Sequence, residues 1–440
     1  MALSAVRYPV LRNPSARHYA VAAAAQASSS NVNVKTLNNK ITLAAVESCS
    51  PAAQVSVIYR AGSRNETYDT QGTAHLLRIC TGLTTKRSSA FGLTRNIQQL
   101  GGDLSVNADR ESICYTLRIS RDKLEPALQY LEDAATKQLF KPWEIEDETP
   151  RIRYEVSAVP APARLVELLY KAAYREGLGY SLYCPKRHIG KISSESLSHF
   201  VNNHYTGSRC AVVSTGVNLS DIESFASVLE VNSGEATDKA AKYLGGEVRK
   251  ERNSELASVA LAVEGGSLKN QKEAIAFAVL QKVAGEGPQV KWGACNTPLH
   301  KALCSASQDP FAAVAFNASH SDSGLFGLIL SAPAASAGKL TEAAAKWLRA
   351  PQFTDADVAR GKAALKVAVL EATDNESLLH ENIAQQAVHF GNVVSIETIA
   401  QAIDSITPAD VKSAANKVSK GKLSLASIGN ISSVPYVEQL

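Results

Sequence analysis

The apolar positions along the chain predict a mixed α and β fold that begins near residue 33. Residues 54–59 alternate polar and apolar side chains, which indicates a strand, and the apolar run in residues 40–44 indicates another. A helical face is predicted in residues 122–138, where apolar side chains recur every three or four positions. The residues on that face are Leu124, Leu128, Leu131 and Ala135.

Glycine and proline positions set the boundaries of the next predicted elements. Gly101 and Gly102 end a short amphipathic helix over residues 93–100, and residues 104–107 and 112–118 form a hairpin. A helix opens at Pro142 and should bend at Pro150. A helix over residues 164–175 and a strand over residues 212–217 close this half of the chain.

The pattern then repeats, which indicates an internal duplication. Residues 257–267 parallel residues 53–63, and residues 351–358 parallel residues 138–145, with a long helix opening at each of the latter pair. We therefore predict two homologous domains of about 200 residues, a normal size for one domain. The predicted boundaries are residues 33–228 for the first domain, 229–252 for a linker and 253–440 for the second.

Composition narrows the possible classes of protein. The 440 residues are 45% hydrophobic and 20% charged, as in an ordinary globular protein. No run approaches the ~20 apolar residues that span a bilayer. The formal net charge is +4, and the chain has no dense Lys/Arg block beyond its first residues, so nucleic acid is not an expected partner.

The N-terminal segment has the composition of an organelle transit peptide. The first 46 residues contain no Asp or Glu, and Arg7, Arg12 and Arg17 lie among Ala and Ser. Residues 17–20 (Arg-His-Tyr-Ala) predict cleavage after Tyr19 and a mitochondrial presequence over residues 1–19. Its removal takes three Arg and no acid, which lowers the formal net charge from +4 to +1. A disordered basic tail is the alternative.

The cysteines predict thiols and no cofactor. There are seven, an odd number, and they are scattered without a C-x-x-C pair, which favours reduced thiols over a disulfide framework. There is also no cysteine cluster for an iron–sulfur centre and no C-x-x-C-H for haem.

Residues 72–80 contain an incomplete form of the inverted zinc-peptidase pattern H-x-x-E-H. His75 keeps the first ligand, but Arg78 stands at the Glu position and Ile79 at the second His. Ile79 has no lone pair, and Arg78 cannot accept a proton from water. The third ligand of such sites, a Glu ~75–80 residues downstream, would fall near Val156, and we expect the adjacent Glu155 to point away. We therefore predict no metal site and read His75 as a structural histidine.

Other groups of residues contain metal-binding or nucleophilic side chains. The spacing of five residues matches no zinc template; these are Cys184, His188, His199, His204 and Cys210. His380-Glu381 lacks a second His, because Ala384 stands four residues after His380. Cys80 reads as a buried thiol and not a nucleophile. We predict no catalytic, cofactor-binding or metal-binding residues.

The motifs together are specific for one family. They are Gly72-Thr-Ala-His-Leu-Leu-Arg78, Leu83-Thr-Thr-Lys86, Ser181-Leu-Tyr-Cys-Pro185, Ile189-Gly-Lys191 and Phe316-Asn-Ala-Ser-His-Ser-Asp-Ser-Gly-Leu-Phe-Gly327. With the basic presequence and the duplication, the chain resembles the M16 peptidase-like family. The resemblance implies two α+β domains, each a mixed sheet with packed helices, arranged as a bowl.

Within the family, the resemblance extends to the core subunits of the mitochondrial ubiquinol–cytochrome c reductase (cytochrome bc1) complex. It implies a non-catalytic structural subunit on the matrix side of the inner membrane, without a cofactor of its own. The implied partners are core protein 1 and the other subunits of a dimeric complex. Contact with the membrane would run through those subunits only.

Two alternatives stay open. The first is the zinc-less α subunit of the mitochondrial processing peptidase, which is expected to carry a long glycine-rich loop; residues 284–289 (Ala-Gly-Glu-Gly-Pro-Gln) offer only a short turn. The second is an active zinc peptidase. Because the third ligand, the distant Glu, is not found at the expected position, the double substitution Arg78→Glu with Ile79→His is not expected to create a peptidase.

Overall fold

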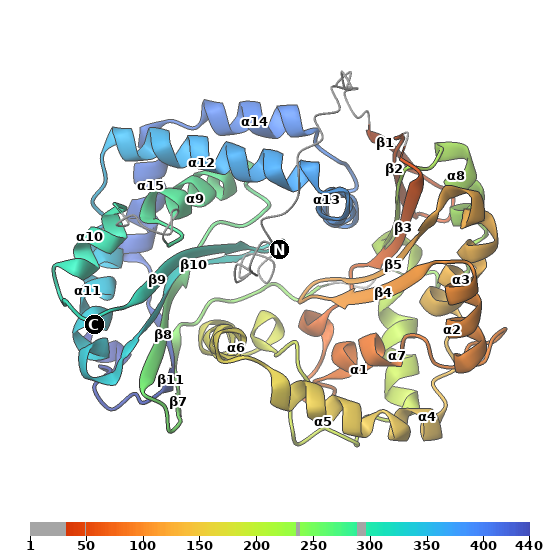
Figure 1. The fold of residues 1–440 in the computed structure, drawn as a ribbon, viewed down its shortest axis with the longest axis horizontal. Helices are drawn as coiled ribbons and strands as arrows, with labels where there is room; N and C mark the ends of the chain where they lie inside the picture. The colour runs from red at the N-terminus through yellow and green to blue at the C-terminus, as the bar shows by residue number, and fades with distance from the viewer. Residues whose placement is uncertain (1–31, 49, 235–237, 288–295) are drawn as a thin grey trace, which may run out of the picture.

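The computed structural model describes residues 32–48, 50–234, 238–287 and 296–440. These residues form two β-sheets, each with its own helices, and the two halves lie side by side (Figure 1). The expected α+β class with two domains is confirmed. The presequence over residues 1–19, with Cys49 and Cys295, lies outside the described residues.

The described residues of the first half form a six-stranded sheet and eight α-helices. Its strands are β1 (Val32–Thr36), β2 (Thr42–Val46), β3 (Ala52–Tyr59), β4 (Asp103–Ala108), β5 (Ile113–Ser120) and β6 (Cys210–Thr215). Its helices are α1 (Thr73–Cys80), α2 (Ala90–Gln99), α3 (Leu124–Thr136), α4 (Pro142–Asp147), α5 (Thr149–Ala158), α6 (Ala161–Tyr174), α7 (Ser194–His204) and α8 (Leu219–Val228).

In the second half, the described residues form a five-stranded sheet and seven α-helices. Its strands are β7 (Gly246–Glu251), β8 (Leu256–Glu264), β9 (Ala312–Ser319), β10 (Gly324–Pro333) and β11 (Ser424–Gly429). Its helices are α9 (Gln271–Ala284), α10 (Pro298–Cys304), α11 (Ala334–Arg349), α12 (Asp355–Asp374), α13 (Glu376–Phe390), α14 (Ile396–Ser405) and α15 (Pro408–Lys420).

The strand orders show the duplication directly. The first sheet runs β1-β2-β6-β3-β5-β4 and the second β7-β11-β8-β10-β9. In each sheet one pair is parallel, β2 with β6 and β7 with β11, and the remaining pairs are antiparallel. Strand β8 thus corresponds to β3, as the parallel between residues 257–267 and 53–63 predicts. The one strand without a counterpart among the described residues is β1.

The second predicted repeat is also present, at the start of α4 and α12. Lys141 is the N-cap of α4 and Thr354 the N-cap of α12, at equivalent positions of the two repeats. Ile145 and Val358 then occupy equivalent buried positions one turn into each helix. The expected bend at Pro150 is a break at Glu148, which separates α4 from α5.

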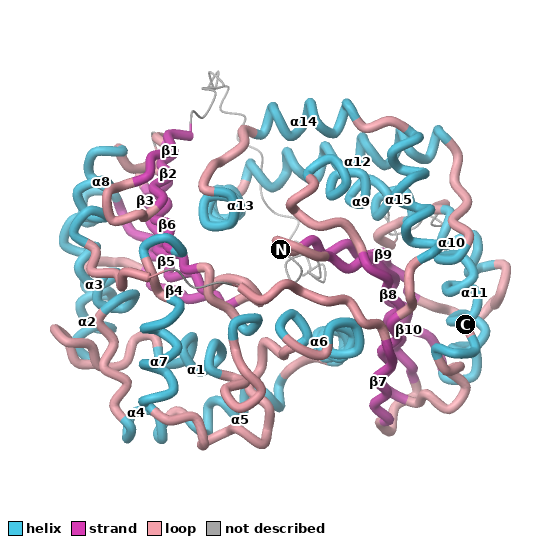
Figure 2. Tube along the Cα trace, turned by 180° about the vertical axis from the view of Figure 1, so that it is seen from behind, coloured by secondary structure: helices cyan, strands magenta, loops and turns pink. Residues whose placement is uncertain are grey.

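Each half contributes one helix that packs on the sheet of the other half. Helix α6 of the first half packs on the second sheet, where Leu165, Leu169 and Ala173 form a core with residues such as Ala260 and Ala426. Helix α13 of the second half packs on the first sheet through a core that includes Ile383, Ala384, Ala387, Ala44 and Val213. Both helices lie between the two sheets (Figures 1 and 2). The halves therefore share two apolar cores, and each stabilises the other.

Part of the predicted linker belongs to the second sheet. Residues 246–251, inside the segment expected to be a linker, form β7 in the second sheet. The five described cysteines (Cys80, Cys114, Cys184, Cys210 and Cys304) are free thiols, as expected. In the part of the chain that the structure describes, no helix is long and apolar enough to cross a membrane.

Candidate functional site

Helix α1 is the buried helix that carries the incomplete zinc motif. Its N-cap, Gly72, has φ +100°, and a Cβ there would lie 2.6 Å from the Sγ atom of Cys184. Only glycine fits both conditions. The carboxylate of Glu66 caps the helix, accepting hydrogen bonds from the amides of Gly72 (2.9 Å) and Ala74 (2.8 Å). Burial raises the pKa of Glu66 to about 8, although these two amides lower it. The cap and the glycine together fix where His75 lies.

His75 is buried and bonded at both ring nitrogens. Its Nδ1 accepts a hydrogen bond from the amide of Cys184 (3.2 Å), so in the neutral ring the proton is on Nε2. The Nε2 atom then donates to Oε2 of Glu155, at 3.1 Å. Burial lowers the pKa of His75, the bond to Glu155 opposes that change, and the charge of Arg78 adds to it. Its role as a structural histidine follows from these two bonds.

The expectation that Glu155 points away is wrong. Glu155 on α5 faces α1, and its Oε2 atom binds both His75 and the guanidinium of Arg78. Val156, where the count from Ile79 led, lies in the core of the first half with 9% of its surface exposed. The count failed because the family spacing is a range, and an error of one residue turns a helical side chain by ~100°.

A cation, the guanidinium of Arg78, thus lies beside His75 and Glu155. Arg78 is partly exposed, and Arg151 approaches the other oxygen of Glu155 at 3.4 Å. Burial raises the pKa of Glu155, but the hydrogen bond from His75 and the charge of Arg78 outweigh burial and hold it below its usual range. The carboxylate is therefore ionised and neutralised by protein groups alone.

The residues present do not fit a catalytic zinc ion. Such an ion needs about three N, O or S ligands and an open position for water. His75 and Glu155 supply two, but the Nε2 atom of His75 carries a proton and Arg78 repels a dication. Ile79, at the position of the second histidine, is 1% exposed within the apolar core. The arrangement ties α1 to α5 and lacks the groups that activate water.

The five candidate residues of a second metal site do not form a cluster of metal ligands. Cys184 and Cys210 are buried thiols, and burial raises the pKa of Cys184 to about 12. His188 contacts the carbonyl of Gln71 through Nδ1 (2.9 Å), His199 is an exposed neighbour of Asn203 on α7, and His204 packs against Phe200. Within the described ranges, no group of three or more His, Cys, Asp or Glu side chains is placed to hold a metal ion.

The other motif candidates have structural surroundings. Burial raises the pKa of Cys80 to about 12, in line with an inert thiol. His380 on α13 is fully buried against the first sheet, 2.6 Å from the Oγ atom of Ser56 and 3.2 Å from the Oγ1 atom of Thr215. In the glycine turn, Ala284 ends α9 and Gly285 accepts from the amide of Ala315 (2.9 Å); Pro288 and Gln289 lie outside the described residues.

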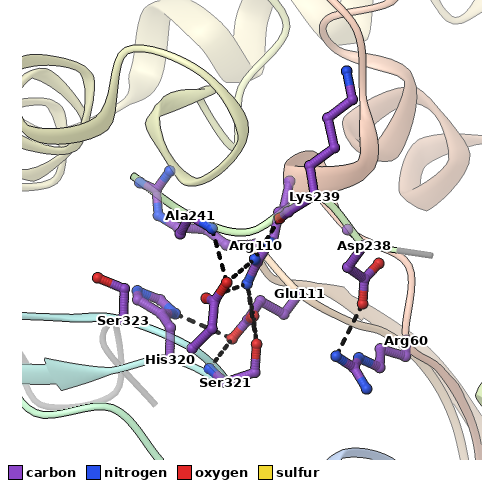
Figure 3. Close-up of polar contacts among 12 residues, drawn as sticks. Arg60, Arg110, Glu111, Asp238, Lys239, Ala241, His320, Ser321 and Ser323 are labelled. Carbon is purple, nitrogen blue, oxygen red and sulfur yellow. Dashed lines mark hydrogen bonds and ion pairs between the residues drawn. The ribbon is translucent and has the colours of Figure 1, made fainter. Parts of the chain in front are cut away.

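A buried ionic cluster joins the two halves (Figure 3). The guanidinium of Arg64, in the turn after β3, pairs with Glu111 at 2.6 Å and with Asp322 at 2.5 Å. Glu111 comes from the β4–β5 hairpin and Asp322 from the β9–β10 turn of the second half. All three side chains are at most 13% exposed. Charges buried in this way need partners, so the cluster fixes how the halves meet.

Neighbouring side chains complete the cluster. Ser321 donates its amide (3.0 Å) and its hydroxyl (2.6 Å) to Glu111, and His320 Nδ1 lies 3.3 Å from the same carboxylate. Burial raises the pKa of Glu111, but the hydrogen bond from His320 and its charge outweigh burial, so the pKa lies well below its usual range. Tyr170 on α6 contacts His320 Nε2 at 2.9 Å.

Sequence reasoning singled out residues 316–327 as a family motif but missed Arg64 and Glu111. The signal was weak because the three charged residues lie far apart in the chain, and charged residues in loops are usually exposed. The contact gives the His-Ser-Asp run of this motif a structural role, since each of those residues binds a group of the first half.

Comparisons with known proteins place the chain in a family. The model of insulinase (peptidase family M16) matches residues 42–186, and the model of the peptidase M16 inactive domain matches residues 191–365. The chain is 36% identical to the human protein "Cytochrome b-c1 complex subunit 2, mitochondrial", over 97% of this chain and 96% of that protein. The rat protein of the same name is 37% identical, over 92% and 91%.

Processing-peptidase subunits are more distant relatives. The Arabidopsis thaliana protein "Probable mitochondrial-processing peptidase subunit alpha-1, mitochondrial" is 26% identical, over 93% of this chain and 84% of that protein. Two matching domain models, the duplicated sheets and the altered H-x-x-E-H helix agree with one another. The chain is therefore a member of peptidase family M16.

Proposed function

We propose that this chain is a non-catalytic core subunit of the mitochondrial ubiquinol–cytochrome c reductase (cytochrome bc1) complex. Its part in electron transfer from ubiquinol to cytochrome c is structural: it supports the subunits that carry the redox centres. The observation that carries the proposal is the 36% identity to a b-c1 complex subunit 2 over nearly the full length of both proteins.

The chemistry of α1 supports a role without catalysis. Arg78 neutralises Glu155, where a peptidase of the family would use a metal ion, and Ile79 gives no ligand. The charge of Arg78 disfavours a zinc ion beside Glu155, and its guanidinium cannot act as a base toward water. The function of the fold then depends on its surfaces and on the contact between its two halves.

The finer assignments follow from membership of such a complex. The partners are core protein 1 and other subunits of a dimeric complex, and the chain lies on the matrix side of the inner membrane. Residues 1–19 form a presequence that is cleaved after Tyr19. The halves behave as domains over residues 33–228 and 253–440, with β7 of the intervening segment belonging to the second.

The main alternative is an α subunit of the mitochondrial processing peptidase. The lower identity of 26% to the Arabidopsis thaliana relative speaks against it. So does the composition of residues 284–289, which contain two glycines and a proline where that subunit is expected to carry a long glycine-rich loop.

The test is to tag the C-terminus of the full chain, solubilise mitochondria gently and purify the tagged protein. We expect quinol–cytochrome c reductase activity and b-type haem absorbance to co-purify in stoichiometric amount. N-terminal sequencing of the same preparation should begin at Ala20. An eluate without haem that cleaves presequence peptides in a chelator-sensitive way would establish the processing-peptidase alternative instead.

A further inference from the structure

Strand β7 leaves one side of the second sheet unpaired. It corresponds to β2 of the first sheet, since each is the parallel neighbour of the strand that closes its half. The outer side of β2 is covered by β1, which pairs with it antiparallel from Val32↔Val46 to Thr36↔Thr42. Among the residues that the structure describes, no strand covers the outer side of β7. The described residues of the second half therefore include no counterpart of β1.

The backbone of β7 presents hydrogen-bonding groups on that side. The amide of Arg252, just after β7, donates to Gly429 of β11 at 3.0 Å, so even-numbered residues direct their backbone groups to β11. Because these groups alternate along a strand, those of Glu247, Arg249 and Glu251 face outward. An open edge of this kind is a template for a further strand.

Four cations from both halves gather beside this edge. Lys250 and Arg252 come from β7 and the residue that follows it, Arg164 from α6 and Lys186 from the loop before α7. Burial lowers the pKa of Lys250, and the charges of Arg164, Arg252 and Lys186 lower it further. In the described part of the chain, none of the four forms an ion pair with a carboxylate.

The carboxylates on β7 itself leave most of this charge uncompensated. Glu247 is engaged by Arg249 at 2.8 Å and by the amide of Val437 at 2.9 Å, and so is not available to the cluster. Glu251 is exposed at the end of the strand. Like charges held together are unfavourable until an opposite charge arrives, so the edge favours an acidic partner.

We propose that β7 accepts an acidic, extended segment of a partner protein as an additional strand, antiparallel to β7 and in the position that β1 has in the first half. Main-chain hydrogen bonds to Glu247, Arg249 and Glu251 supply affinity, and the four cations select acidic side chains. The proposal rests on the proposed function, since the partner is another subunit of the same assembly. A strand fits this edge better than anionic lipid, because lipid headgroups would not satisfy both the donors and the acceptors of a strand.

The first experiment is hydrogen exchange, resolved to single amides, on the tagged assembly and on the free recombinant chain. In the assembly, we expect the amides of Glu247, Arg249 and Glu251 to exchange at least roughly tenfold more slowly than in the free chain. A photo-crosslinking residue at position 251 should capture an acidic peptide of another subunit. Capture of lipid alone, or of a segment without net negative charge, overturns the proposal.

Two double variants test the role of charge. One reverses two positive charges at the edge of β7, and its matched control reverses two positive charges on helix α11. Lys250→Glu with Arg252→Glu should remove both the protection and the crosslink, while Lys339→Glu with Lys346→Glu on α11, both exposed and unpaired in the described structure, should preserve them. Unprotected amides in an unmodified assembly that contains b-type haem refute this inference and leave the proposed function standing. Absence of haem from the purified protein refutes the proposed function itself.

Discussion

At the scale of single residues, Arg78 decides what the zinc helix can do. His75 and Glu155 lie side by side, with 3.1 Å between Nε2 and Oε2. Arg78 supplies the positive charge that a metal ion would supply elsewhere in the family. The site is therefore a hydrogen-bonded ion pair, in which Arg78 and Ile79 stand where the H-x-x-E-H pattern has its Glu and second His.

This arrangement changes the expectation for restoring the motif. Because Glu155 is in place, Arg78→Glu with Ile79→His completes a set of three ligands, and we expect the double variant to bind about one zinc ion per chain. Metal content after dialysis, by mass spectrometry, checks this. The unmodified chain and Arg78→Glu alone should retain far less zinc.

A third substitution is the control for that experiment. Adding Glu155→Gln to the double variant should abolish stoichiometric zinc binding, because the amide is a poor ligand for the ion. Circular dichroism should show that each variant is folded, since Ile79 is a core residue. A folded double variant that holds no more zinc than the unmodified chain would show that Glu155 is not the third ligand.

At the scale of elements, the turns after β3, β4 and β9 meet in one buried cluster. Three turns that are far apart in the sequence contribute Arg64, Glu111 and Asp322. Loops usually lie exposed on the protein surface, but these three turns are held together by charged side chains that are buried away from water. The contact therefore determines the geometry of the two halves more than it adds to their stability.

Removing the cation should be costly. Arg64→Met leaves Glu111 and Asp322 close together without their partner, and we expect the free energy of unfolding to fall by about 3–5 kcal/mol. Urea denaturation of the full chain measures the change. Arg151→Met is the matched control, because its ion pairs are at 3.4 Å and its side chain is 54% exposed; it should change stability by less than about 1 kcal/mol.

A double-mutant cycle identifies the interaction responsible. If Arg64 acts through Asp322, the loss from Arg64→Met should shrink by about 1–3 kcal/mol in the Asp322→Asn background. Additive effects of the two substitutions would mean that the pair is not coupled and that Arg64 acts through its other partners, Glu111, Ser321 and the carbonyl of Lys239.

At the scale of the whole molecule, the exchanged helices make the two halves one unit. Helix α13 buries His380 against the first sheet, and burial lowers the pKa of His380 to about 3. The neutral ring is thus the form that the folded protein holds. Its contribution to stability is present in full above the ordinary histidine pKa of about 6.5 and is lost as the pH falls from there toward 3.

Acidification should therefore loosen the contact between halves. Between pH 6.5 and 5, this one group should cost up to about 2 kcal/mol of unfolding free energy, because each pH unit contributes about 1.4 kcal/mol. We expect His380→Gln to lose correspondingly less stability than the unmodified chain over this interval, in urea denaturation at each pH. His199→Gln, at an exposed position, should follow the unmodified chain. Parallel curves for His380→Gln and the unmodified chain would contradict the assignment.

The sequence by itself determined the class of fold, the duplication and the loss of the zinc motif. These depend on local patterns: alternation in β3, the glycines after α2, the proline break near Glu148 and the identity of Arg78 and Ile79. Each is set by the conformational preference or the chemistry of residues close together in the chain. Patterns of this kind can be interpreted without knowing which distant residues each segment contacts in the folded protein.

Only the tertiary structure decided which distant groups meet. Glu155 faces His75 because the break at Glu148 sets the rotation of α5, and a count along the sequence cannot fix a rotation of ~100° per residue. Strand β7 joins the second sheet although its charged sequence resembles a linker, because β11 lies beside it to supply a parallel partner. The burial of Arg64, Glu111 and Asp322 likewise depends on two halves meeting, and no local pattern encodes that.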